Sequence, residues 1–284
     1  MIDGYLKKVG AKVDSTSPID YGTQYRVSRG AEQAIVNVYR GKKGLRVVVQ
    51  KTTALADELR KLFGTSAPAA TSSPAVPTWA AWCGSDESGK GDYFGPLTVA
   101  AVGLTTSTAS VAAGWGVRDC KTMSDATALE LDKKIREALP FTLIGWMPEE
   151  YNRRYEAARN VGRLLGEAHA EAIDGVVGKL PAAEAAVVDQ FGDEDHVASR
   201  LRASIALIQR PKADETDLAV AAASVVARAA FLRGLAKLVK AWGMPLHKGA
   251  GPEVLENARA FLKRHGREKL GEVAKLHFKT TQQL

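Results

Sequence analysis

The sequence has only two cysteines among its 284 residues, Cys83 and Cys120, and this scarcity excludes a disulfide-stabilised fold. No Cys-x-x-Cys pair is present, so the common kind of structural zinc site is excluded as well. No uncharged apolar stretch approaches the roughly 20 residues that a membrane-spanning helix needs. The first residues lack the apolar stretch of a secretory signal, so we expect a cytoplasmic protein with reduced thiols and no membrane partner.

Charge is absent from one long segment, GTSAPAATSSPAVPTW, which runs from Gly64 to Trp79 and contains three prolines. A stretch of this composition cannot bury a core and is typical of a semi-extended linker. The sequence therefore predicts a small N-terminal domain over 1–63, a linker over 64–78 and a large domain over 79–284 that ends in a helical region.

Positive charge is concentrated in the small domain. The whole chain carries a net charge of +7, and residues 1–63 hold 12 Lys+Arg against 6 Asp+Glu, so this domain carries +6 of it. A small basic domain beside a nearly neutral one favours an accessory that binds a polyanion. A solvated basic face without a partner is the alternative.

The small domain is predicted to contain mostly strands. Residues 25–27, 34–39 and 45–49 are β-branched or alternate between polar and apolar. A basic, glycine-bearing turn at 40–44 joins the last two, and 53–63 has the pattern of an amphipathic helix. Strands with basic turns and tyrosines would form a platform for nucleic acid, although either tyrosine could equally belong to the core.

The large domain alternates between apolar runs and helical patterns, which predicts an α/β class with a mixed sheet. We expect strands at 80–84, 97–103, 141–146, 185–189 and 205–208, and helices at 124–139, 148–180 and 218–242.

Acidic residues follow two of these strands and precede a helix. Asp86 and Glu87 come after the first apolar run, Asp189 ends another, and Asp214 lies ahead of the last long helix. If these segments converge on one cleft, the carboxylates repel each other unless cations neutralise them. Ligands that are all oxygen favour Mg²⁺ or Mn²⁺, and two such ions would support phosphodiester hydrolysis.

Other interpretations of these residues stay open. The acids could be separate solvated caps, and Asp214 could be the N-cap of the helix that follows. The segment 84–90 also fits a phosphate-binding loop up to its last position, where Gly91 replaces the required Ser or Thr. A nucleotide hydrolase is therefore a remote alternative, because Asp86 and Glu87 would repel the phosphates.

The segment DESGKGDYFGP, residues 86–96, resembles the opening signature of type 2 ribonucleases H and is closest to bacterial ribonuclease HIII. Similar segments extend over about residues 80–280. They are GVRDCK at 116–121 with Cys120 in place of Ser, Tyr151-Asn152, HAEAI at 169–173, VVDQF at 187–191, KAD at 212–214 followed by AAAS at 221–224, and KLHFKT at 275–280.

The resemblance implies an RNase H-like α/β fold, with a mixed sheet flanked by helices and a small α+β N-terminal domain resembling TATA-binding protein that helps to grip the substrate. It implies an endonuclease that cleaves the RNA strand of RNA/DNA hybrids and leaves 5′-phosphate and 3′-hydroxyl ends. We also expect the enzyme to be a monomer. Cleavage at single embedded ribonucleotides, as in ribonuclease HII, is the alternative.

The resemblance also assigns Asp86, Glu87, Asp189 and Asp214 as catalytic residues that bind two Mg²⁺ or Mn²⁺ ions. The last position departs from the pattern, because ribonuclease HIII usually has Glu there and ribonuclease HII has Asp. The neighbouring Glu215 could substitute for Asp214.

Substrate contacts are expected from the backbone of Ser88, Gly89, Lys90 and Gly91, because glycine lets a 2′-hydroxyl approach closely. Lys121 is a candidate for the DNA-strand backbone, and Ser224, expected near a helix start, is a weaker one. His169 and His277 have no metal-ligand spacing to another His or Cys, so the prediction leaves both outside the catalytic set.

Overall fold

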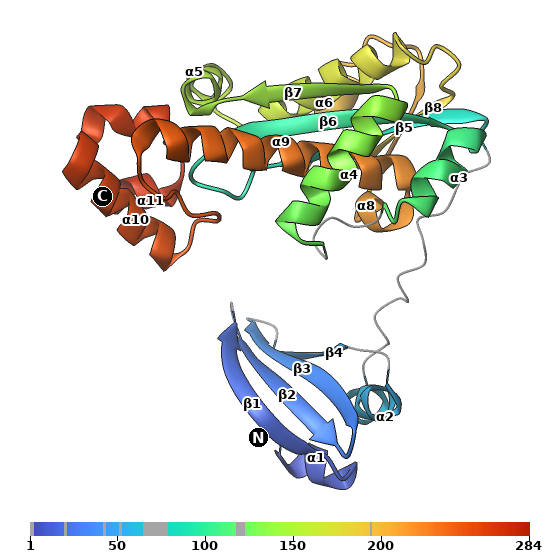
Figure 1. Cartoon of the computed structure of the whole chain (residues 1–284), viewed down its shortest axis with the longest axis vertical. Coiled ribbons are helices and arrows are strands. Elements are labelled where there is room, and N and C mark those ends of the chain that lie inside the picture. The colour runs from blue at the N-terminus through green and yellow to red at the C-terminus, as the bar shows by residue number, and fades with distance from the viewer. Residues whose placement is uncertain are drawn as a thin grey trace. The chain divides into compact units, whose positions relative to one another are not determined.

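The computed structural model describes residues 3–19, 22–41, 44–50, 53–64, 79–117, 123–193 and 195–284. The chain divides into two compact units, Met1–Ser72 and Ser73–Leu284 (Figure 1). Apart from Gly64, which ends a helix, the predicted linker at 64–78 lies outside the described residues.

The small unit is an antiparallel sheet in the order β1-β2-β3-β4 with two helices packed on one face. The apolar residues of that face, such as Val27 and Val36, meet Leu55 and Leu59 of the second helix. The predicted strands lie inside β2, β3 and β4, whereas β1 and α1 were not predicted. The elements are α1 (Asp3–Lys8), β1 (Lys12–Ile19), β2 (Gly22–Arg29), β3 (Glu32–Gly41), β4 (Gly44–Gln50) and α2 (Ala54–Phe63).

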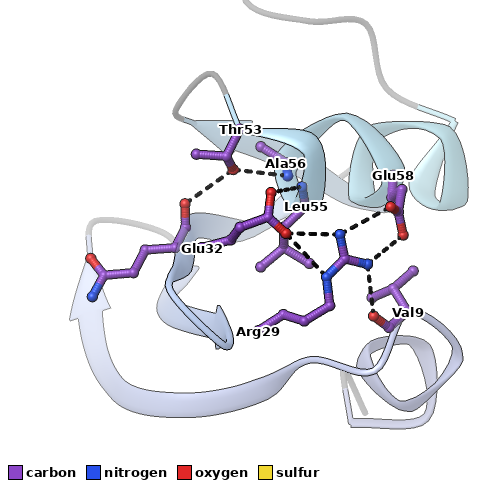
Figure 2. Close-up of polar contacts among 8 residues, drawn as sticks. Val9, Arg29, Glu32, Thr53, Leu55, Ala56 and Glu58 are labelled. Atoms are coloured by element: carbon purple, nitrogen blue, oxygen red, sulfur yellow. Dashed lines mark hydrogen bonds and ion pairs between the residues drawn. The ribbon is translucent and has the colours of Figure 1, made fainter.

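Arg29 of β2 links β3, α2 and the segment after α1 through its guanidinium group (Figure 2). Its guanidinium donates to Glu32 at 2.9 Å, to Glu58 of α2 at 2.7 Å and to the carbonyl oxygen of Val9 at 3.2 Å. The hydrogen bonds from Arg29 lower the pKa of the Glu58 carboxyl. The charge of this arginine is therefore neutralised within the unit.

The large unit contains a mixed sheet in the order β7-β6-β5-β8-β9, which confirms the predicted α/β class. β6 runs antiparallel to β5 and β7, whereas β8 runs parallel to β5 and β9. The elements are β5 (Ala81–Ser88), β6 (Leu97–Thr105), α3 (Thr106–Gly114), α4 (Asp125–Ala138), β7 (Phe141–Trp146), α5 (Pro148–Ala158), α6 (Val161–Val177), β8 (Ala185–Asp189), α7 (Asp195–Ala198), β9 (Ala206–Arg210), α8 (Ala213–Thr216), α9 (Leu218–Trp242), α10 (Pro252–His265), the 3₁₀ helix η2 (Arg267–Glu272) and α11 (Lys279–Gln282).

Helices cover both faces of this sheet (Figure 1). α3, α4 and α9 pack on the face of Trp82 and Val187, and α6 packs on the face of Cys83 and Val188. Burial raises the pKa of the Cys83 thiol to about 12, so this cysteine is a packed apolar residue. α9 is long and apolar enough to cross a membrane, but 83% of its most apolar stretch is buried inside the large unit.

The contact between α9 and β5 depends on Gly84. A Cβ atom at this position would lie 2.1 Å from the backbone nitrogen of Val220, so only glycine permits the close approach. Asp217 fixes the start of α9, because its carboxylate accepts from the backbone N–H groups of Ala219 and Val220. Asp217 is therefore the N-cap that the sequence analysis assigned, as an alternative, to Asp214.

Candidate active site

Two neighbouring parallel strands bring the first acids together. Ser85 of β5 is paired with Val188 of β8, so the next residues, Asp86 and Asp189, lie side by side. Both acids and Glu87 line one cleft of about 360 Å³ in the large unit. β5 extends to Ser88, so Asp86 and Glu87 lie within the strand, whereas the sequence analysis placed them after it.

Asp86 is nearly buried on the face of the sheet that α9 covers. Its carboxylate accepts from the backbone N–H of Glu87 at 2.8 Å and from the hydroxyl of Ser224. Burial, reinforced by the Glu87 carboxylate, raises the pKa of Asp86 well above its usual range. A divalent cation would relieve this destabilisation, so the position suits a metal ligand.

Glu87 lies on the opposite face of the strand, because successive side chains alternate. Its Oε2 is 3.2 Å from Nε2 of His169 in α6, and its Oε1 accepts from Nζ of Lys90 at 3.3 Å. Burial acts to raise the pKa of the Glu87 carboxyl. The contacts with His169 and Lys90 outweigh this effect, so the pKa lies below its ordinary value. Glu87 is therefore an ionised carboxylate beside a neighbour that resists ionisation.

The third and fourth acids lie around the start of α8. Asp189 accepts from the backbone N–H of Ala213 at 2.9 Å, which holds α8 next to the cleft. Asp214 is fully buried in α8 and is not among the residues that line the cleft. Glu215 is partly exposed and forms an ion pair with Lys212 at 2.5 Å. The choice between Asp214 and Glu215 as fourth ligand stays a prediction.

The donor set is chemically suited to Mg²⁺ or Mn²⁺, because carboxylate oxygens crowd one cleft. In the described part of the chain, however, no three His, Cys, Asp or Glu side chains already form a group that could hold a metal ion. Metal binding therefore requires at least one of these carboxylates to move toward the ion.

The loop after β5 forms one wall of the cleft through Ser88, Gly89, Lys90 and Gly91. Gly89 has a φ of +88°, and a Cβ there would lie 2.1 Å from the carbonyl oxygen of Pro96. At Gly91 no heavy atom lies within 4 Å of the place of a Cβ, so its backbone faces open space. Lys121 lies outside the described residues.

This loop is not a phosphate-binding loop of the nucleotide-hydrolase kind. Such a loop is followed by a helix whose N-terminus faces the phosphates. Here the chain returns from β5 into the antiparallel strand β6, and residues 89–96 contain no helix. The nucleotide-hydrolase alternative is therefore wrong.

Ser224 also differs from its prediction. It is the seventh residue of α9 rather than a residue at the helix start, so the dipole of the helix terminus does not act there. It still lines the cleft, and its hydroxyl contacts Asp86.

Basic residues line the cleft as well. Arg228 of α9 and Lys248 both line it, and each donates to Asp125 at 2.7 Å. The hydrogen bonds from Lys248 and Arg228 lower the pKa of Asp125. The cleft therefore presents carboxylates for cations beside cations for phosphate groups.

A buried lysine, which begins the segment KLHFKT and was given no role in the sequence analysis, holds the loop in place. Nζ of Lys275 donates to the carbonyl oxygens of Asp92 and Gly95, both at 2.7 Å, and its backbone N–H donates to Tyr93 at 2.8 Å. The side chain is completely buried, and burial lowers its pKa to about 7. A neutral amine still has the two hydrogens that the two carbonyl oxygens need.

We expect Lys275→Met to reduce the free energy of unfolding by about 1–3 kcal/mol, because two buried carbonyls lose their donor. The folded-state pKa of about 7 lies below the ordinary lysine value, so the unfolded chain binds more protons between these pH values. The advantage of the wild type over the variant should therefore grow as the pH rises above 7. Urea unfolding at pH 7 and pH 9.5 measures the difference in unfolding free energy between the wild type and Lys275→Met. The same difference at both pH values would contradict the lowered pKa of Lys275.

Comparisons with known proteins find relatives of one kind. The model of the family described as Ribonuclease HII matches residues 83–281. The ribonuclease HIII of Protochlamydia amoebophila is 38% identical over 200 residues, which are 69% of this chain and 66% of the relative. That of Bacillus pumilus is 34% identical over 261 residues, 87% of this chain and 84% of the relative. The crystal structure of Bst-RNase HIII in complex with Mn²⁺ superposes with a TM-score of 0.67 at 28% identity, covering 99% of this chain and 94% of that chain.

Proposed function

The chain belongs to the ribonuclease HIII family and is a metal-dependent ribonuclease H, and on that premise we propose that it cuts the RNA strand of RNA/DNA hybrids endonucleolytically. One observation carries the proposal: Asp86, Glu87 and Asp189 line a single cleft beside Arg228 and Lys248. The products carry 5′-phosphate and 3′-hydroxyl ends. The proposal includes a monomeric enzyme located in the cytoplasm.

Asp86, Glu87, Asp189 and Asp214 are the proposed ligands of two Mg²⁺ or Mn²⁺ ions. When bound, such ions activate water and stabilise the charge that develops on the phosphate and the leaving oxygen. Asp86 has the central place among these residues, because its carboxylate is next to Glu87 along β5 and next to Asp189 across the sheet. The role of Asp189 includes holding α8, and with it Asp214, through the N–H of Ala213.

Recognition of RNA is assigned to the loop at 88–91. A 2′-hydroxyl both donates and accepts, and the exposed backbone around Gly91 can do the same. Lys90, whose side chain is 40% exposed, can leave Glu87 and meet a phosphate. Arg228 and Lys248 provide further phosphate contacts, which position the duplex without reading its sequence.

We assign binding of the RNA/DNA duplex to the small unit. Its helices pack on the apolar face of the sheet, whereas the opposite face carries polar residues in rows across the strands. Ser15 is paired with Arg26, and Ser17 with Gln24, whose amide donates to Asn37 at 3.1 Å. Ser15, Ser17 and Arg26 are exposed. We call this surface the open face.

A cleavage assay tests the proposal and its alternative together. End-labelled duplexes are incubated with Mg²⁺ or Mn²⁺, one containing an all-RNA strand and one containing a single embedded ribonucleotide. We expect several cuts in the all-RNA strand, with products that a ligase can rejoin because they carry 5′-phosphate and 3′-hydroxyl ends. Asp214 favours the alternative, cleavage at a single embedded ribonucleotide, because Asp at this position is typical of ribonuclease HII. Cleavage of the embedded ribonucleotide alone would replace the proposed specificity with that of ribonuclease HII.

A further inference from the structure

His169 is completely buried and is held on three sides. Its Nδ1 lies 2.8 Å from Oγ of Ser85, and the Ser85 hydroxyl itself donates to the carbonyl oxygen of Ala100 at 2.9 Å. Its ring stacks on Phe191, with the centroids 4.8 Å apart and the planes inclined by 15°. The ring therefore has one fixed orientation, which directs Nε2 at Glu87.

The two oxygens of Glu87 differ in what holds them. Oε2 faces Nε2 of His169, which cannot move without unpacking α6 from β5. Oε1 faces Lys90, whose ammonium group lies 5.6 Å from the centre of the Phe191 ring and whose side chain is 40% exposed. Only Lys90 can withdraw into solvent, so Oε1 is the oxygen that becomes available.

We infer that His169 is a positioning residue that fixes Glu87 through Oε2 and so presents Oε1 to a divalent ion. This inference rests on the proposed function, in which Glu87 is a metal ligand. Groups that hydrogen-bond to metal ligands orient them, and their loss typically weakens metal binding about 10- to 100-fold. His169 does not touch the ion or the substrate, and its effect passes through Glu87.

A titration of Mn²⁺ into the full chain, followed by calorimetry without substrate, tests the inference. We expect His169→Phe, which keeps an aromatic ring on Phe191 but removes both ring nitrogens, to weaken Mn²⁺ binding about 10- to 100-fold. His169→Gln should restore most of the affinity, because its amide N–H reaches the place of Nε2. When Glu87→Gln is already present, His169→Phe should cause no further loss.

Each result has a distinct meaning. An equal loss from His169→Phe with and without Glu87→Gln, or no loss at all, would overturn the positioning role. If Glu87→Gln alone leaves Mn²⁺ binding unchanged, the proposed function fails instead. His277→Phe is the matched control, because His277 stacks on Tyr155 with a centroid distance of 4.4 Å, does not line the cleft and should not affect Mn²⁺ binding.

A further variant keeps the test valid if His169→Phe does not fold. Ser85→Ala keeps the imidazole and removes only the group that anchors Nδ1. We expect it to weaken Mn²⁺ binding in the same direction by a smaller factor, whereas unchanged binding would count against the inference.

Discussion

Asp86→Asn should abolish metal-dependent cleavage of the hybrid and leave hybrid binding intact. Asn has nearly the same shape but no negative charge, so it weakens the attraction for the divalent ion at the point where the three carboxylates meet. Metal ions contribute several kcal/mol of transition-state stabilisation, and a loss of about 4 kcal/mol corresponds to a rate about 10³-fold lower. Single-turnover cleavage and equilibrium binding, both measured at saturating Mg²⁺, separate the two properties.

The same variant has an opposite effect on the metal-free fold. Burial and the Glu87 carboxylate raise the pKa of Asp86, so the ionised carboxylate costs folding free energy once the pH exceeds the ordinary aspartate range. In EDTA, the melting temperature of Asp86→Asn should therefore exceed that of the wild type at pH 7, and the difference should shrink as the pH falls. An inactive variant with a lower melting temperature would indicate misfolding rather than loss of a ligand.

Asp174→Asn provides the matched control. The Asp174 carboxylate is also mostly buried, and it accepts from the backbone of Arg202 and Ala203 on the surface of the large unit. It does not line the cleft. We expect unchanged turnover for Asp174→Asn, because only the structural contacts of this residue are affected.

A loss of hybrid binding in Asp86→Asn while turnover stays normal would contradict the role of Asp86 as a metal ligand.

The strands and helices at the centre of the large unit could be predicted from the sequence because their boundaries are marked chemically. β7 and α9 begin and end where the apolar pattern does, and β8 ends on Asp189. Local signals failed where polar residues continue a strand. β5 includes Asp86 and Glu87, since pairing with β6 satisfies their backbone groups. β1 is largely polar because, among the described residues of the small unit, the helices pack on one face of its sheet.

The residues that support the site could not be predicted in the same way. His169 contacts Glu87 across 82 positions, and Lys275 contacts Asp92 across 183. A lone histidine in an amphipathic helix has the pattern of a core residue, and its burial is indeed complete. Only the fold brings its second nitrogen to a carboxylate. Asp214 is a different case. The segment KAD at 212–214 identified it as a candidate metal ligand, but nothing in the sequence predicted that its side chain is fully buried.

Deleting residues 1–63 should weaken hybrid binding and flatten its dependence on salt. This segment carries +6 of the net charge of +7, and each phosphate contact that is lost removes about 0.9 from the slope of log K against log salt. Loss of three or four contacts would lower the slope by about 3, so a fourfold rise in salt would weaken binding of the full chain about 60-fold more than binding of the truncated protein. Binding is measured at several salt concentrations in an Asp86→Asn background, so that the hybrid stays intact.

Turnover at saturating hybrid should survive this deletion, because Ser73–Leu284 is a compact unit that contains the cleft and its own core. The truncated protein should therefore have a lower affinity for the hybrid and an unchanged rate of cleavage at saturation. An unchanged salt slope in the truncated protein would show that the basic residues are only a solvated surface.

A pair of arginines makes the test more specific than the deletion. Arg26 is exposed on the open face, whereas Arg29 is neutralised by Glu32 and Glu58 (Figure 2). If net charge alone governs binding, Arg26→Ala and Arg29→Ala lower the salt slope equally. If the open face binds the duplex, Arg26→Ala lowers the slope by about 1 and leaves the fold stable. Arg29→Ala should instead lower the melting temperature of the small unit, because α2 loses its link to β2, while the salt slope changes little.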